Sequence, residues 1–212
     1  DEARDTVQKG ATRARSGSTN FYQDIAVREL ARQAPGQAPR MVAAGIFVTP
    51  NLGDSLLADP DLTSLARQKD GVRSEEALRH VVEVNLARGA DVIKTRVNER
   101  AGLPDQDPLT QVYSREQLSW IVAAAKKAGK GVLCHSYSQQ GCYDAVMAGI
   151  RSLEHGVFVD ERTLTEMKIS GTYFTPTLTA IAGMVGDKDP ILDKRGRDFL
   201  PILKRAVLTA HQ

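Results

Sequence analysis

Short runs of β-branched and aromatic residues alternate with longer amphipathic stretches along most of this chain. That alternation is typical of β–α–β units, in which parallel strands are joined by helices. It predicts an α/β protein with six strands, at residues 18–22, 40–44, 91–97, 131–135, 152–155 and 172–176.

Helices are predicted in the gaps between the strands, at residues 74–88, 114–128, 140–148, 161–169 and 198–211. The second of these helices opens on Ser114-Arg115-Glu116-Gln117, a capping box in which serine and glutamine satisfy the first backbone N–H groups. Gly129, Gly149 and Gly171 each follow a predicted helix, where a left-handed residue commonly ends it. The helix, glycine, strand order that results is the one that barrels and open α/β sheets require.

Two stretches rich in proline and glycine, residues 46–70 and 98–113, are predicted to be long loops. The second loop follows the predicted strand 91–97. In a barrel, the loops at the carboxyl ends of the strands build the active site. We therefore expect chemistry at this end of the sheet.

Composition predicts one globular domain over residues 1–212, since 42% of residues are hydrophobic and 25% are charged. The net charge is +2, and basic and acidic residues are interspersed along the chain, so neither nucleic acid nor a membrane is expected as a partner. The polar start of the sequence does not resemble a signal peptide, which makes a cytoplasmic location the default. Cys134 and Cys142 lack metal-site spacing and are interpreted as small buried hydrophobes.

Two histidines end consecutive predicted strands. His135 and His155 are separated by one strand–helix unit, so a parallel sheet places both imidazoles at the same end. A single histidine at such a position is more often a hydrogen-bonded structural residue. Two in succession favour a divalent metal, and imidazole suits zinc.

Lys94 lies in the otherwise apolar run Val92-Ile93-Lys94. Burying an unpaired ammonium group is costly, so three roles stay open on position alone. The lysine can form a Schiff base, it can react with carbon dioxide to give a carbamate that binds metal, or its amine can reach water at the strand end.

Several segments carry a family resemblance. The phrase A-G-x-x-S-x-E-H-G at Ala148–Gly156 is followed by P-T-L at Pro176–Leu178, and Gly89–Lys94 and Val132–Tyr137 fit the same pattern. These segments resemble the amidohydrolase superfamily, in the branch similar to imidazolonepropionase and to metal-dependent prolidases and carboxypeptidases. The family's fold is a (β/α)8 TIM-like barrel. Gly17–Asp24 resembles its second strand more loosely.

The resemblance implies that Lys94 is a carboxylated bridging ligand and that His135 and His155 are metal ligands. One or two divalent ions, zinc first among them, would be the cofactor. Tyr137 and Arg96 would contact a small-molecule or short-peptide substrate. From the residues alone, Tyr137 can equally be a packed tyrosine at the barrel rim, and Arg96 can form a structural ion pair.

The chain also departs from the family pattern. The family's first strand ends in His-x-His, which is absent among His80, His135, His155 and His211. The general-base Asp of its eighth strand is expected beyond Gln212, so no catalytic residue is identified within the chain. We expect a partial barrel holding strands two to seven, whose open edges favour association, for example as a homo-oligomer.

The function expected from the resemblance is hydrolysis of a C–N bond, in an amide, lactam or peptide, by a metal-activated water. One alternative is a catalytically incomplete fragment or inactive homologue without activity of its own. A second alternative is a Schiff-base lyase that uses Lys94 as its nucleophile.

Overall fold

The computed structural model describes residues 2–57, 59–68 and 70–212. By its internal contacts the chain divides into two compact units. The first holds the residues up to Lys94 together with Ala123–Lys130, and the second holds Thr95–Val122 with Gly131–Gln212. Two segments, β3 (Ile93–Arg96) and α4 (Arg115–Lys127), therefore contribute to both units. The prediction of a single domain stays a prediction.

The first unit begins with a parallel pair of short strands. Its elements are α1 (Glu2–Gln8), β1 (Arg13–Arg15), η1 (Asn20–Tyr22), α2 (Gln23–Gln33), β2 (Arg40–Val42), η2 (Gly53–Leu57), η3 (Pro60–Arg67) and α3 (Glu75–Ala87). In the register of β1 and β2, Ala14 lies opposite Met41. After β2 the main chain lies beside the segment that leads into β3, since the Ala43 carbonyl accepts from Asp91 N–H at 2.8 Å.

The predicted strand at residues 18–22 is wrong. The strand lies earlier, at β1, and Asn20–Tyr22 forms a 3-10 turn instead. Phe21 and Tyr22 have left-handed φ angles of 56° and 54°, and the Tyr22 hydroxyl donates to Asp59 at 2.9 Å. A contact with a residue distant in the sequence thus overrides the tendency of aromatic residues to lie in strands.

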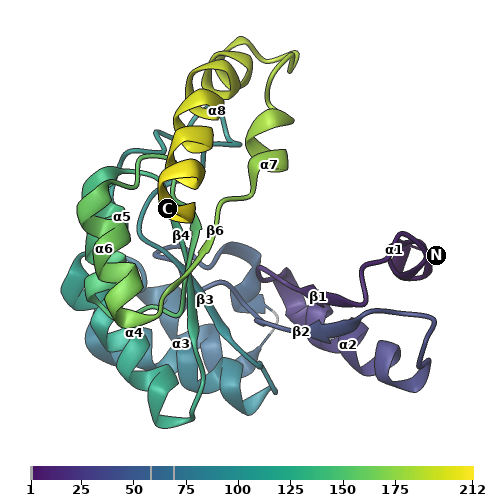
Figure 1. Ribbon diagram of the computed structural model, residues 1–212. Helices are drawn as coiled ribbons and strands as arrows, with labels where there is room; N and C mark the ends of the chain where they lie inside the picture. The colour runs from purple at the N-terminus through teal and green to yellow at the C-terminus, as the bar shows by residue number, and fades with distance from the viewer. Residues whose placement is uncertain (1, 58, 69) are drawn as a thin grey trace. The chain divides into compact units, whose positions relative to one another are not determined.

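The second unit contains most of a four-stranded sheet in the order β3-β4-β5-β6, since Ile93 and Lys94 of β3 belong to the first unit. Its other elements are β4 (Val132–Ser136), α5 (Gln139–Met147), β5 (Ser152–His155), α6 (Glu161–Ser170), β6 (Tyr173–Thr175), α7 (Leu178–Ala182) and α8 (Pro190–His211). Strands β4, β5 and β6 are parallel neighbours, and α5 packs against β4, β5 and α6 (Figure 1). The predicted alternation of strands and helices is confirmed here.

Helix ends follow the sequence signals closely. The Ser114 hydroxyl accepts from Gln117 N–H, and the Gln117 side chain accepts from Ser114 N–H, as a capping box requires. Gly129, Gly149 and Gly171 all have left-handed φ angles. The last helix is longer than predicted, because Asp189 caps it and Pro190 begins it.

The two predicted loops have different outcomes. Residues 46–70 contain the 3-10 helices η2 and η3, with residues 58 and 69 outside the described part. The stretch after β3 is a loop as predicted, and it is called the β3–α4 loop (residues 97–114) below.

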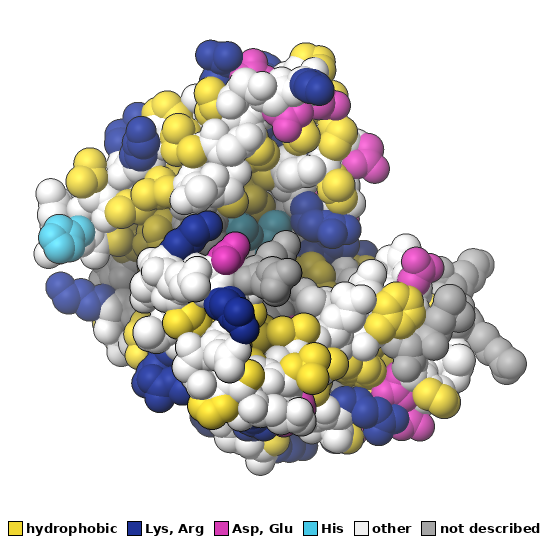
Figure 2. Space-filling view, turned by 90° about the vertical axis from the view of Figure 1, so that its right-hand side faces the viewer, with side chains coloured by type: hydrophobic (Ala, Val, Ile, Leu, Met, Phe, Trp, Pro, Cys, Tyr) yellow, Lys and Arg dark blue, Asp and Glu magenta, His cyan; other side chains and the backbone are white. Residues whose placement is uncertain are grey.

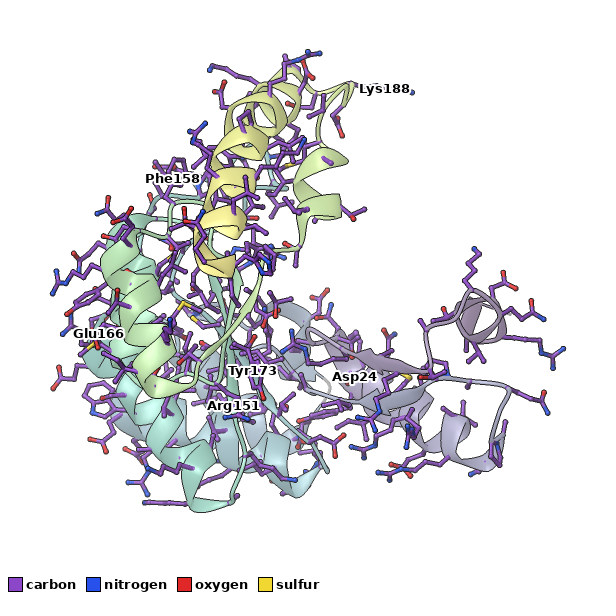
Figure 3. All side chains as sticks on the ribbon, viewed as in Figure 1. Asp24, Arg151, Phe158, Glu166, Tyr173 and Lys188 are labelled. Carbon is purple, nitrogen blue, oxygen red and sulfur yellow. The ribbon has the colours of Figure 1, made fainter. Side chains whose placement is uncertain are left out.

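Helices α7 and α8 pack on each other over a hydrophobic cluster in the second unit. Its buried members are Ala101, Tyr137, Val157, Ile181, Met184, Phe199 and Leu203. The ring of Phe158, marked in Figure 3, meets Phe199 edge to face at 5.2 Å. Tyr137 directly follows β4, and Phe199 of α8 lies in the same cluster, so α8 packs near the carboxyl end of β4.

Charged side chains are interspersed with hydrophobic and neutral ones over the face shown in Figure 2. Among the described residues, no helix is long and apolar enough to cross a membrane.

At the start of the sheet, Arg151 lies over the ring of Tyr173 at 4.6 Å from its centre, and the two are side by side in Figure 3.

Candidate active site

The structure brings His135 and His155 together in the second unit. Their ring centres lie 4.6 Å apart at an angle of 74°. Strand register alone does not produce this contact, because Ser136 lies opposite His155 and Glu154 lies opposite His135. His155 reaches its neighbour from a left-handed backbone, with φ of 67°. The predicted pairing is present, and it depends on this local twist at the end of β5.

Each imidazole has one nitrogen held by a protein oxygen. The Nε2 of His135 lies 3.1 Å from the Glu99 carbonyl oxygen. The Nδ1 of His155 lies 2.6 Å from the Thr177 hydroxyl oxygen. Ligating histidines are typically oriented in this way by a partner on the nitrogen that does not face the metal.

Tyr137 completes the aromatic group around the two imidazoles. Its ring lies almost parallel to His155, at 7° and 5.2 Å between centres, and meets His135 edge-on at 4.9 Å. Burial raises the pKa of the Tyr137 phenol well above its ordinary value, and the charge of Arg195 acts weakly in the opposite direction. The phenol is therefore neutral at pH 7 and can donate a hydrogen bond. Its contact with substrate stays a prediction.

Lys94 and Arg96 are both buried on β3. The Arg96 guanidinium donates to the Glu99 carboxylate at 2.7 Å, which is the ion pair that the sequence left open as an alternative. Glu99 therefore serves two site residues, Arg96 through its side chain and His135 through its carbonyl. The metal-binding role of Lys94 and the substrate contact of Arg96 remain predictions.

The β3–α4 loop that carries Glu99 is held in place at two points. Near its base, Asn98 is fully buried and forms hydrogen bonds with the main chain of Tyr137. Farther out, the guanidinium of Arg195 on α8 donates to three loop carbonyls at 2.5 to 3.0 Å, those of Ala101, Leu103 and Gln106. This anchoring fixes the carbonyl that contacts His135.

Sequence reasoning missed the roles of Asn98, Thr177 and Arg195. Only Thr177 had a local signal, since it lies in the P-T-L phrase. Glu154 lies opposite His135 in the strand register and accepts a hydrogen bond from the Ser152 hydroxyl at 2.5 Å.

Two imidazoles provide half of the four ligands that a zinc site usually needs. Within residues 2–57, 59–68 and 70–212, no group of three or more His, Cys, Asp or Glu side chains is placed to hold a metal. The other two histidines lie on helices, His80 on α3 with its Nε2 beside the Asp61 carbonyl and His211 near the end of α8. The residues present thus fit one side of a metal centre.

Comparison with known proteins bears on the identity of this site. A sequence model of the amidohydrolase family matches residues 1–197. The chain belongs to the amidohydrolase family. This match confirms the resemblance seen in the sequence. The relatives of this chain in the family are metal-dependent hydrolases.

An individual relative is ochratoxinase of Aspergillus niger, 31% identical over 143 residues that make up 68% of this chain and 29% of that protein. Similar solved structures include an Xaa-Pro dipeptidase with bound methionine, with a TM-score of 0.81 and 23% identity, covering 99% of this chain and 54% of that one. The structure of A. niger ochratoxinase matches with a TM-score of 0.79 and 21% identity, over 98% and 51% of the two chains.

A prolidase complexed with N-methylphosphonate-L-proline matches with a TM-score of 0.78 and 22% identity, over 99% of this chain and 54% of that one. The chain therefore spans about half the length of these solved chains and 29% of the curated relative. At these identities the structural matches establish the fold, an α/β architecture with parallel sheets that corresponds to half of an amidohydrolase barrel.

Proposed function

We propose that this chain is part of a metal-dependent hydrolase that cleaves a C–N bond in an amide, lactam or peptide. The observation that carries the proposal is the pair His135 and His155, on neighbouring strand ends with ring centres 4.6 Å apart and one nitrogen of each ring beside a protein oxygen. Membership of the amidohydrolase family supports it. We further propose that β1 to β6 correspond to strands two to seven of a (β/α)8 barrel.

In this proposal His135 and His155 bind a divalent ion, with zinc as the first candidate because it favours imidazole. Lys94, carboxylated, is the proposed oxygen ligand, on the basis of its position in the family pattern. A bound ion of this kind supplies a Lewis acid and makes a water molecule acidic enough to attack a carbonyl carbon near neutral pH.

The protein's own residues would position the substrate. The Tyr137 phenol is neutral and can donate to a carbonyl or carboxylate oxygen. Arg96 carries a permanent positive charge, held in place by Glu99, and would attract an acidic substrate group. Both features suit a small-molecule or short-peptide substrate, and a dipeptide or a peptide's C-terminal residue is the leading candidate.

A second candidate, an incomplete or inactive homologue, is favoured by one specific observation. The described residues place only two imidazoles together, and no larger group of His, Cys, Asp or Glu. A protein that binds no metal would keep the same fold and would use the histidines only for packing.

Elemental analysis separates the two candidates. Zinc would be measured in the 212-residue chain and in the complete product of its gene, each compared with a His135→Asn/His155→Asn double variant. His211→Asn is the matched control, since this exposed histidine at the end of α8 lies outside the site. We expect about two zinc ions in the complete product, one or fewer in the chain, and loss of zinc in the double variant only.

Activity would be followed as amine release from Xaa-Pro dipeptides and N-acyl amino acids, before and after removal of zinc by a chelator. Zinc-dependent release from either substrate class supports the hydrolase. Absence of zinc from every form of the protein would refute it and leave the inactive homologue.

A further inference from the structure

The contact between Thr177 and His155 joins two residues that both have unusual backbones. Thr177 follows β6 with φ of 50° and ψ of 43°, and His155 ends β5 with φ of 67°. A left-handed conformation is rare for any residue except glycine, and it is a true outlier for a β-branched one such as threonine. Glycine at position 177 would adopt this backbone without strain. Threonine there therefore suggests that its side chain is required.

The Thr177 side chain has a specific partner, the imidazole of His155. Its hydroxyl oxygen lies 2.6 Å from the Nδ1 of His155, across 22 residues of sequence. The ring of His155 is also stacked against Tyr137, which limits tilting of the imidazole plane. Stacking does not distinguish this orientation from the one turned by 180° about the Cβ–Cγ bond, whereas the hydroxyl contacts Nδ1 specifically.

We infer that Thr177 is a positioning residue, whose hydroxyl accepts the Nδ1 hydrogen of His155 and so directs the lone pair of Nε2 toward a metal ion. The inference rests on the proposed function. A neutral imidazole carries one hydrogen, so holding it on Nδ1 leaves Nε2 as the metal-binding atom. Thr177 itself touches neither metal nor substrate.

His135 differs from His155 in that its partner is a main-chain carbonyl. A carbonyl can only accept, so Nε2 of His135 donates to Glu99 and its lone pair lies on Nδ1. No substitution removes that carbonyl. A hydroxyl, in contrast, can be deleted, which makes His155 the imidazole whose orientation can be tested.

Three substitutions at position 177 separate the hydroxyl from the backbone strain. Thr177→Val keeps the shape and removes the hydroxyl, Thr177→Ser keeps the hydroxyl, and Thr177→Gly removes both the hydroxyl and the strain. Thr172→Val is the matched control, because the Thr172 hydroxyl donates to the Ile150 carbonyl, away from the imidazoles. All four would be made in the complete gene product.

The first readout needs no metal. Nitrogen-15 NMR of the zinc-free protein reports which nitrogen of His155 carries the hydrogen. We expect the Nδ1–H form in the wild type, in Thr177→Ser and in Thr172→Val, and a mixture of both forms in Thr177→Val and Thr177→Gly.

The second readout is the zinc dissociation constant, measured by competition with a coloured chelator. We expect binding roughly 10- to 100-fold weaker for Thr177→Val and Thr177→Gly, with Thr177→Ser and the control near the wild type. Thr177→Gly should also keep or raise the melting temperature of the zinc-free protein, since it relieves strain. If Thr177 were needed only for packing, its substitution would lower both the zinc affinity and the thermal stability.

The outcomes are distinguishable. The Nε2–H form of His155 in the wild type, or wild-type zinc affinity in Thr177→Val, would overturn the inference. If the tautomer follows the hydroxyl and the wild type binds no zinc, the proposed function fails and Thr177 serves only to orient the ring.

Discussion

Asn98 joins two segments of the second unit through one buried amide. Its Oδ1 accepts from the N–H groups of Tyr137 at 2.9 Å and Ser138 at 3.1 Å. Its Nδ2 donates to the Ser138 hydroxyl at 2.9 Å, with longer contacts to the carbonyls of Leu109 and Thr110. The residue is fully buried, so water cannot replace these partners. Replacement by alanine should therefore be costly.

The magnitude follows from the groups left without a partner. Each buried donor that loses its acceptor costs about 1–3 kcal/mol. Tyr137 is buried and takes the full penalty, whereas Ser138 is half-buried and recovers part of it from water. For Asn98→Ala we expect the free energy of unfolding to fall by about 3–4 kcal/mol, a large part of the 5–15 kcal/mol typical of a folded protein.

Urea unfolding followed by tryptophan fluorescence, and by far-UV circular dichroism so that both units are reported, measures this effect. The single tryptophan, Trp120, lies in α4 within the second unit, the unit that contains Asn98. Asn51→Ala is the matched control, because exposed Asn51 accepts one hydrogen bond, from Gly53 N–H at 2.8 Å, and its loss should cost under about 1 kcal/mol. Equal losses in the two variants would refute the reasoning about buried donors.

Three further predictions concern other parts of the chain. Arg195→Met should leave the β3–α4 loop unclamped, and hydrogen–deuterium exchange of that loop should rise while exchange in the sheet stays unchanged. Gly45→Ala should lower the melting temperature, because Gly45 has φ of 71° and a Cβ there would lie 2.4 Å from Asn85 Oδ1; an unchanged value would contradict this. The pKa of Asp144 is lowered overall. Burial acts to raise it, but hydrogen bonds to the carboxylate, including those from Arg115, have the larger combined effect. The contribution of Asp144 to stability is therefore present above the ordinary carboxyl pKa of about 4, and it is lost as the pH falls through the lower pKa of the folded state. The urea midpoint of the Asp144→Asn variant should accordingly fall less on acidification than that of the wild type.

The sequence alone located most elements of the second unit. Strand β5 lies where predicted, and α4 and α6 begin and end within one or two residues of the prediction. These features depend on neighbouring residues, such as the capping box at Ser114 and the glycine that ends α6. Local rules therefore suffice for them. They fail at residues 18–22, where Tyr22 is held by Asp59, 37 positions away.

For the site, the sequence determined which imidazoles meet, since parallel strands joined by one helix bring His135 and His155 to the same end. Only the tertiary structure decided how they meet. The strand register sets Glu154 opposite His135, and the ring of His155, which has a left-handed backbone, nevertheless lies against His135. The partners that orient the rings, Glu99 and Thr177, lie 36 and 22 residues from the imidazoles they contact. Contacts of that range depend on how distant segments fold together, which no local pattern of residues encodes.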